Sequence, residues 1–190
     1  MLSMPDETSL VIEIATDPVL AARVAFLAAV TFPLACPAHS TREDMAGHIA
    51  AALTPQRFAD WIDDDSCEVI VAREGEDGPL VGYALVIHTP PTDHDVCAAV
   101  GDALSSEVSK MYVLPGHHGT HRADRPAHRL MDAAVRSAQA RGSQVLWLGV
   151  NQLNERAQRY YRKMGFTQAG TRTFQMSGAV ENDYVMTRRI

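Results

Sequence analysis

The sequence predicts an α/β (α+β) fold with a mixed central sheet of about seven strands and flanking helices. Residues 107–166 run strand, loop, helix, strand, helix, which is the order that builds a parallel pair of strands with an anion-binding cleft at its end. Strand patterns in 68–87 and 166–190 each indicate an antiparallel hairpin. A chain of 190 residues has room for one well-buried core, so we expect a single domain over 1–190.

The first third of the chain predicts one strand and three helices. Residues 10–15 alternate as a strand does, and a helix is expected from Pro18, where apolar residues begin to recur at helical spacing. Two prolines within residues 31–37 interrupt this helix. The capping-box motif Ser40-Thr-Arg-Glu43 indicates the start of a second helix, and Thr54-Pro55 indicates the start of a third, short one.

The remaining two thirds continue with strands and two amphipathic helices. We expect, in order, strands 68–72 and 80–87, a long connection 89–106, a strand 107–114, a loop, a helix that ends before Gly142, a strand 144–150, a helix 154–161, and strands 166–175 and 183–190. The sequence shows neither internal repeats nor low-complexity segments.

Composition bears on location and redox state. No run of 18 apolar residues is present, and Asp6, Glu7 and Glu13 stand where a secretory signal carries cations. We therefore expect a cytoplasmic protein with no membrane partner, whose residues 1–9 are flexible. The three cysteines form no C-x-x-C pair, so we expect reduced thiols.

Charge is divided unevenly along the chain. The net charge is −6, yet residues 1–106 hold seventeen Asp/Glu against four Lys/Arg, and residues 107–190 hold six against thirteen. This asymmetry favours an anionic ligand on the C-terminal half and a cationic one facing the N-terminal half, although two solvated faces explain it equally well. We expect no nucleic-acid partner.

The loop 115–125 has the composition of an anion site. It contains glycines and arginines and leads into a helix, whose N-terminal N–H groups attract anions such as pyrophosphate. Neither a Walker A lysine nor a G-x-G-x-x-G motif is present. The histidines of this region (His117, His118, His121 and His128) lack carboxylate or cysteine partners at metal-site spacing, so we expect loop histidines near an anion and no metal.

Several motifs in the second half resemble a known family. They are Glu-Val-Ser-Lys-Met-Tyr-Val-Leu-Pro from Glu107, a glycine-bearing loop before an Ala-x-x-Leu-Met helix, and Leu-Gly-Val-Asn-Gln-Leu-Asn-Glu-Arg-Ala-x-x-Tyr-Tyr-x-Lys-Met-Gly-Phe. Together they resemble the GNAT superfamily of acyl-CoA-dependent N-acetyltransferases. The ending Gly170-Thr-Arg-Thr-Phe-Gln-Met-Ser-Gly with Asp183-Tyr-Val-Met is similar to bacterial spermine/spermidine acetyltransferases. The resemblance implies a GNAT-like fold.

The resemblance also implies a donor site for acetyl-CoA. Met111 and Val113 would offer backbone groups to the pantetheine arm, where the fourth strand diverges from the fifth at a bulge. The family's pyrophosphate loop would correspond either to Arg122-Ala-Asp-Arg125-Pro-Ala127 or to a segment that begins at His118-Gly119; an arginine replaces the central glycine, and the loop is longer. The implied coenzyme A contacts are Met111, Tyr112, Val113, His118, Gly119, Arg122, Arg125, Ala127, His128, Asn154 and Tyr161.

Two catalytic groups follow from the resemblance. Helical spacing places Asn154, Ala157 and Tyr161 on one face. The family's matching tyrosine protonates the sulfur of coenzyme A, a role that implies Tyr161 as the acid; taken alone, the same residue reads as a core aromatic. Glu107 matches a glutamate that often serves as general base through water, and an ordinary strand-end carboxylate is the alternative.

The expected acceptor is a primary amine that attacks the thioester directly. By the family pattern it enters near Phe32, Glu107 and Phe174, and the narrower resemblance implies a polyamine or another small cationic amine. The cluster of Asp60, Asp63, Asp64 and Asp65 suits such a ligand, but we favour a solvated helix end. The alternatives are a protein N-acetyltransferase and a non-catalytic acyl-CoA-binding regulator. A monomer and a homodimer are both compatible with the sequence.

Overall fold

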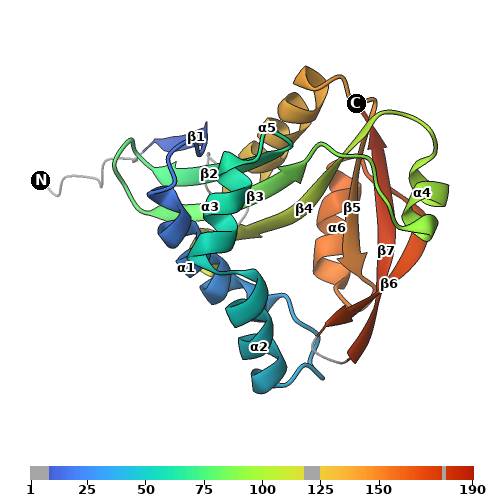
Figure 1. Cartoon of the computed structure of the whole chain (residues 1–190), viewed down its shortest axis with the longest axis horizontal. Coiled ribbons are helices and arrows are strands. Elements are labelled where there is room, and N and C mark those ends of the chain that lie inside the picture. The colour runs from blue at the N-terminus through green and yellow to red at the C-terminus, as the bar shows by residue number, and fades with distance from the viewer. Residues whose placement is uncertain (1–8, 118–124, 177–178) are drawn as a thin grey trace, which may run out of the picture.

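The computed structural model describes residues 9–117, 125–176 and 179–190, so the expected flexible N-terminus lies outside it except for Ser9. Figure 1 shows the arrangement. The strands are β1 (Leu10–Ile14), β2 (Cys67–Glu74), β3 (Leu80–Ile87), β4 (Ser105–Val113), β5 (Val145–Asn151), β6 (Thr167–Met176) and β7 (Ala179–Arg189). The helices are α1 (Leu20–Thr31), α2 (Arg42–Ala52), α3 (Pro55–Asp63), α4 (His94–Val100), α5 (Pro126–Ala140) and α6 (Glu155–Lys163), with short 3-10 helices η1 (Phe32–Leu34) and η2 (Pro115–His117). Among these, no helix is long and apolar enough to cross a membrane.

The strands form one mixed sheet in the order β1-β2-β3-β4-β5-β7-β6. Of the described neighbours, β4 and β5 are parallel, and the others are antiparallel. A parallel pair needs a crossover connection, and α5 supplies it. The predicted fold class, including both hairpins, is confirmed.

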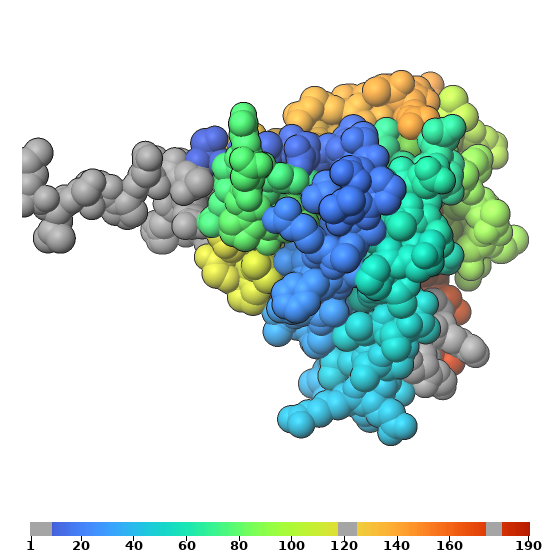
Figure 2. Space-filling view, turned by 60° about the vertical axis from the view of Figure 1, so that its left-hand side comes forward, coloured from blue at the N-terminus to red at the C-terminus, as the bar shows by residue number. Residues whose placement is uncertain are grey.

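Helices cover both faces of this sheet, with α1 and α3 on one face of β2–β3 and α5 on the other (Figure 1). The side chains of β2 alternate accordingly, because Val69 and Val71 pack in the cluster of α1 and α3, whereas Ile70 and Ala72 pack in the cluster of α5. Figure 2 shows α1 and α3 on one surface, with α2 extending beyond them. Since α2 has no fully buried residue, the core holds it less firmly than α1.

The expectation of an irregular connection over 89–106 is wrong in part. Residues His94–Val100 form α4, and β4 begins at Ser105, two residues earlier than predicted. Asp93 caps α4, since its carboxylate accepts the backbone N–H groups of Asp95 and Val96, each at 3.0 Å. Val96 and Val100 are one turn apart and buried, which anchors this short helix on β5 and β7.

The second helix begins one residue later than the capping box indicated. Thr41 is its N-cap, and the Thr41 hydroxyl accepts the backbone N–H of Asp44 at 3.1 Å. The predicted cap of the third helix is confirmed, because the Thr54 hydroxyl accepts the N–H of Arg57 at 3.2 Å. These caps fix where α2 and α3 start beside the segment 31–37.

Candidate active site

The parallel strands β4 and β5 are paired only at their beginnings. Their ladder ends at the pair Glu107–Trp147. Relative to β3, β4 then contains one extra residue, Ser109, which forms a β-bulge. The expected divergence at a bulge is therefore present, and it leaves an opening between the two strands.

Backbone N–H groups of β4 face this opening. The N–H of Leu114 bonds the carbonyl of Val81 in β3 at 2.9 Å. Successive N–H groups of a strand alternate in direction, so those of Met111 and Val113 point away from β3 and toward the opening. These are the two residues to which the resemblance assigned contacts with pantetheine.

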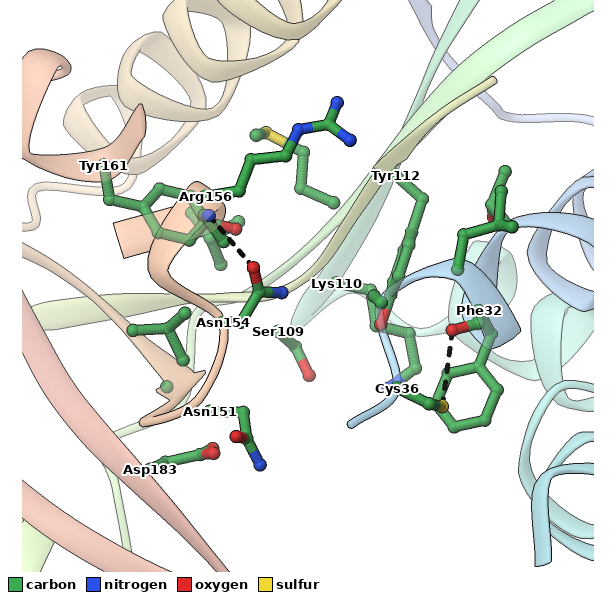
Figure 3. Close-up of a pocket in the computed structure, with 18 of the residues that line it drawn as sticks. Phe32, Cys36, Ser109, Lys110, Tyr112, Asn151, Asn154, Arg156, Tyr161 and Asp183 are labelled. Atoms are coloured by element: carbon green, nitrogen blue, oxygen red, sulfur yellow. Dashed lines mark hydrogen bonds between the residues drawn. The ribbon is translucent and has the colours of Figure 1, made fainter. Parts of the chain in front are cut away.

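A cavity of about 520 Å³ extends from the opening to the segment 31–37 beside α2 (Figure 3). It brings together residues from β4, β5, β6, β7 and the first turns of α5 and α6. The predicted site residues that line it are Phe32, Met111, Tyr112, Val113, Ala127, Asn154 and Tyr161. The sequence-predicted donor and acceptor regions therefore meet in one cavity.

Helix α6 places Tyr161 on the wall of this cavity. Asn154 caps the helix by accepting the N–H of Ala157 at 3.0 Å, and all three residues line the cavity, as their spacing predicted. The ring of Tyr161 packs against Phe166 with centroids 6.0 Å apart. Burial raises the pKa of Tyr161 to about 12, so its phenol carries a proton at neutral pH.

The neighbouring Tyr160 is bound differently. Its hydroxyl donates to the carbonyl of Ala127 at 2.8 Å and so ties α6 to α5. Burial raises the pKa of Tyr160 as well. The ring of His128 packs edge-on against Tyr160, with centroids 5.5 Å apart. The Tyr160 hydroxyl therefore has a structural partner. The Tyr161 hydroxyl, in contrast, makes no hydrogen bond to the residues that the structure describes.

An Arg172-centred cluster lies beside the opening. Arg172 on β6 reaches Asp183 on β7 at 3.4 Å and Glu107 on β4 at 3.8 Å. Burial raises the pKa of Glu107, and the charges of Arg172 and Lys110 partly offset this effect. Arg172 and Asp183 line the cavity, whereas Glu107 lies behind Arg172 and is not part of its wall.

A second carboxylate, Glu181, closes the β7 end of the cavity. The Oε1 atom of Glu181 lies 2.7 Å from His39 Nε2, and its Oε2 atom accepts the amide of Asn151 at 2.8 Å. The bond to His39 lowers the pKa of Glu181, so the carboxylate stays ionised at neutral pH. Glu181 thereby connects β7 to the segment that precedes α2.

A half-buried lysine faces the same cavity from β4. Lys110 follows the bulge, and its ammonium lies 5.0 Å from the ring centre of Trp61 on α3. Burial lowers the pKa of Lys110, with partial opposition from the charge of Glu107. Nearby, the ring of His48 stacks on Phe32 with centroids 4.5 Å apart.

The other predicted residues have different positions. Arg125 is the exposed N-cap residue of α5 and makes no side-chain capping bond. His118, Gly119 and Arg122 lie outside the described residues. The backbone of Phe174 pairs with Glu181, but its side chain is outside what the structure describes. Their assigned contacts stay predictions.

Two further expectations concern acidic and metal-binding groups. Asp64 accepts hydrogen bonds from Ser66 and, with Asp60, Asp63 and Asp65, lies away from the cavity wall, as a solvated helix end does. Within the described ranges, no three His, Cys, Asp or Glu side chains are grouped to hold a metal ion.

Sequence reasoning missed the charged residues that line the cavity. These are Lys110, Arg156, Arg172, Glu181 and Asp183, and their polar neighbours His39 and Asn151 were missed as well. The available signal was a charged side chain within a predicted strand, which Lys110 and Asp183 both provide. That signal marks a candidate residue but does not say which charges meet.

A family match and similar proteins identify the chain as an N-acetyltransferase. Residues 37–166 match the Acetyltransferase (GNAT) family, and the chain belongs to this family. Two relatives, each called an uncharacterized N-acetyltransferase, come from Mycobacterium bovis and Mycobacterium tuberculosis. Each is 42% identical over 167 residues, which cover 88% of this chain and 96% of the relative.

A solved structure supports the same fold. The PaiA N-acetyltransferase from Thermoplasma acidophilum, solved in complex with coenzyme A, matches with a TM-score of 0.70. It is 14% identical in sequence, and the match covers 95% of this chain and 99% of that one. At this identity the likeness concerns the fold alone.

Proposed function

We propose that this N-acetyltransferase transfers the acetyl group of acetyl-CoA directly to the primary amine of a small acceptor. The observation that carries the proposal is one continuous cavity. It joins the opening between β4 and β5, where Tyr161 lies, to the carboxylates Glu181 and Asp183. An ammonium group is attracted to such carboxylates, and a thioester in the opening would be within its reach.

The opening fits the narrow arm of coenzyme A. Met111 would donate its N–H to the arm, and the N-terminus of α5, which Arg125 leaves without a side-chain cap, would face the pyrophosphate. The Oδ1 atom of Asn154 already accepts the N–H of Ala157, so the amide NH₂ of Asn154 is the part left to contact the coenzyme. Bound acetyl-CoA supplies the thioester and the thiol leaving group.

Protein side chains would handle the two protons of the reaction. Glu107, which stands behind the cavity wall, would take a proton from the acceptor ammonium through an intervening water. The neutral amine would then attack the thioester carbon, and the C–S bond would break as Tyr161 donates its phenolic proton to the departing sulfur. The second proton of the amine, released as the amide forms, would restore the phenol of Tyr161. The raised pKa of Glu107 brings this carboxyl nearer to the range of a useful base, because burial disfavours its charged form.

The narrower sequence resemblance suggests the first acceptor class to assay. Polyamines, which the resemblance to spermine/spermidine acetyltransferases implies, contain the required primary amine and are the first class to assay. A protein amino group and a purely regulatory use of acyl-CoA binding are the alternatives to exclude. No observation in the cavity favours either of them.

The test is acetyl transfer by the purified protein. Acetyl-CoA is mixed with a panel of polyamines, aminoglycosides, amino acids and peptides, and the release of free thiol is followed. We expect release with at least one small amine, and a fall of about tenfold or more in kcat for Glu107→Gln. Coenzyme A binding without release for any amine would reject the enzymatic proposal and support the regulator.

A further inference from the structure

The cavity holds a lysine that forms no ion pair with the residues that the structure describes. Lys110 is half-buried and lines the cavity, and within the described parts of the chain no carboxylate is within ion-pair distance of its ammonium. Its close partner is the face of Trp61, and Glu107 acts on its charge only from a longer distance. A partly buried cation without a direct ion pair is stabilised when a ligand supplies one.

The carboxylate side of the cavity is also incompletely matched. Asp183 is 5% exposed. Its Oδ1 atom is buried without a hydrogen-bond partner, while Oδ2 receives Arg172 at 3.4 Å. Glu181, in contrast, has partners on both oxygens. Asp183 therefore retains one unsatisfied acceptor atom, which an ammonium group of a ligand would satisfy once the side chain turns toward the cavity.

The charges that line the acceptor part of the cavity are balanced. Lys110 and Arg172 are its cations, and Glu181 and Asp183 are its anions. Arg156 also lines the cavity, but Figure 3 shows it on the Tyr161 side, away from Asp183. A ligand with two or more ammonium groups would bring one of them close to a fixed cation, whereas a ligand with one charge of each sign would match Lys110 and the Oδ1 atom of Asp183.

We infer that the acceptor is a zwitterion, an amino acid or a similar amino-carboxylate, whose anionic group binds Lys110 while its amine lies toward Asp183. This inference rests on the proposed acetyl transfer and specifies its substrate class. Lys110 directly follows the bulge residue Ser109 and precedes Met111, whose N–H faces the opening. An anion held by Lys110 thus lies in the same cavity as the point where the thioester is expected.

The experiment compares amino acids with their amides, which have the same shape and amine but lack the negative charge. Glycine, β-alanine and 4-aminobutyrate are each assayed beside the corresponding amide and the diamine of the same length. We expect at least one amino acid to exceed its amide in kcat/KM by about tenfold to a hundredfold, mainly through KM, because a hydrogen-bonded charge pair is lost in the amide. Equal rates, or faster reaction of the diamine, would overturn the inference and leave the transferase proposal intact.

Variants of one residue then locate the anion site. Lys110→Met is expected to abolish the preference for the amino acid, and Lys110→Arg to retain it. Arg57→Met is the matched control, because Arg57 also lies over Trp61, at 5.4 Å, but is exposed and not part of the cavity wall. If Lys110→Met keeps the preference for the amino acid over its amide, with an unchanged melting temperature, the assignment of the anion site to Lys110 is wrong. If both Lys110→Met and Lys110→Arg lose the preference, the shape of the lysine side chain and not its charge determines the preference, which also contradicts the assignment.

Binding provides a readout that does not need turnover. N-acetylglycine and its amide, as representative products, are titrated calorimetrically into the wild type and Lys110→Met in the presence of coenzyme A. We expect tighter binding of the acid, and loss of this difference in the variant. If the acid binds more tightly in this way but no thiol is released with any amine, the transferase proposal fails and the anion site stands. If thiol is released but the acid and its amide bind equally well, the anion site alone is rejected.

Discussion

Replacing Tyr161 with Phe tests the role of the phenol most directly. The variant loses one hydroxyl, while the ring contacts with Tyr160 at 5.4 Å and with Phe166 at 6.0 Å can remain. The pKa of Tyr161 is raised to about 12, so the wild-type group is protonated throughout the neutral range. Loss of a positioned proton donor lowers kcat by about a hundredfold, with a tenfold fall as the lower bound, which corresponds to about 1.4–2.7 kcal/mol of activation free energy.

The matched control is Tyr160→Phe on the same helix. This variant removes the 2.8 Å hydrogen bond to the carbonyl of Ala127. We expect a loss of about 1 kcal/mol in unfolding free energy, a melting temperature lower by about 2–4 °C, and a small change in kcat. Steady-state thiol release and thermal denaturation are measured for both variants. Equal losses of kcat, or an unchanged rate in Tyr161→Phe, would refute the assignment of the proton donor.

The pH profile gives an independent check on the same group. The form of Tyr161 that donates a proton is the neutral phenol, which is lost only as the pH rises through its pKa of about 12. Because Tyr161 does not ionise between about pH 7 and pH 10, we expect no fall in kcat in this range that is caused by Tyr161. A fall in that range that disappears in Tyr161→Phe would show that the phenol ionises far more readily than its burial implies.

Three further variants examine the core, the acid stability and the charged cluster. Leu130→Ala removes a fully buried side chain and should lower the unfolding free energy by about 2–5 kcal/mol in urea denaturation. Burial lowers the pKa of His88 in the folded protein, whereas in the unfolded chain the pKa is about 6.5. The unfolded chain therefore takes up the proton first as the pH falls, so the contribution of neutral His88 to the unfolding free energy is complete above about pH 6.5 and is lost below it. His88→Gln should flatten the dependence of the urea unfolding free energy on pH between about pH 7.5 and pH 5.5. A methyl group at Gly149 would overlap the guanidinium of Arg172, so Gly149→Ala should displace Arg172 and raise KM for the acceptor with little change in melting temperature.

The parallel unit was the most predictable part of the fold. Its strands and helices are long enough to show clear periodicity, and its sequence motifs indicated both the opening and the face of α6 that contains Tyr161. Helix α4 was missed because seven residues contain only one pair of buried residues at helical spacing, Val96 and Val100. Its cap, Asp93, resembled an ordinary turn residue after two prolines.

Periodicity, and caps within a few residues of each other, were enough to predict the elements other than α4, the mixed sheet and the local geometry of α6. The charges that meet in the cavity depend on the tertiary structure. Lys110, Arg172 and Asp183 come from β4, β6 and β7, and they approach because β7 pairs with β5 while β6 forms the sheet edge. Arg172 extends over Gly149 toward Glu107. Gly149 has no side chain, which leaves the space that the guanidinium of Arg172 occupies. Such a meeting depends on the order of strands in the sheet, which is not encoded in the spacing of residues along one strand.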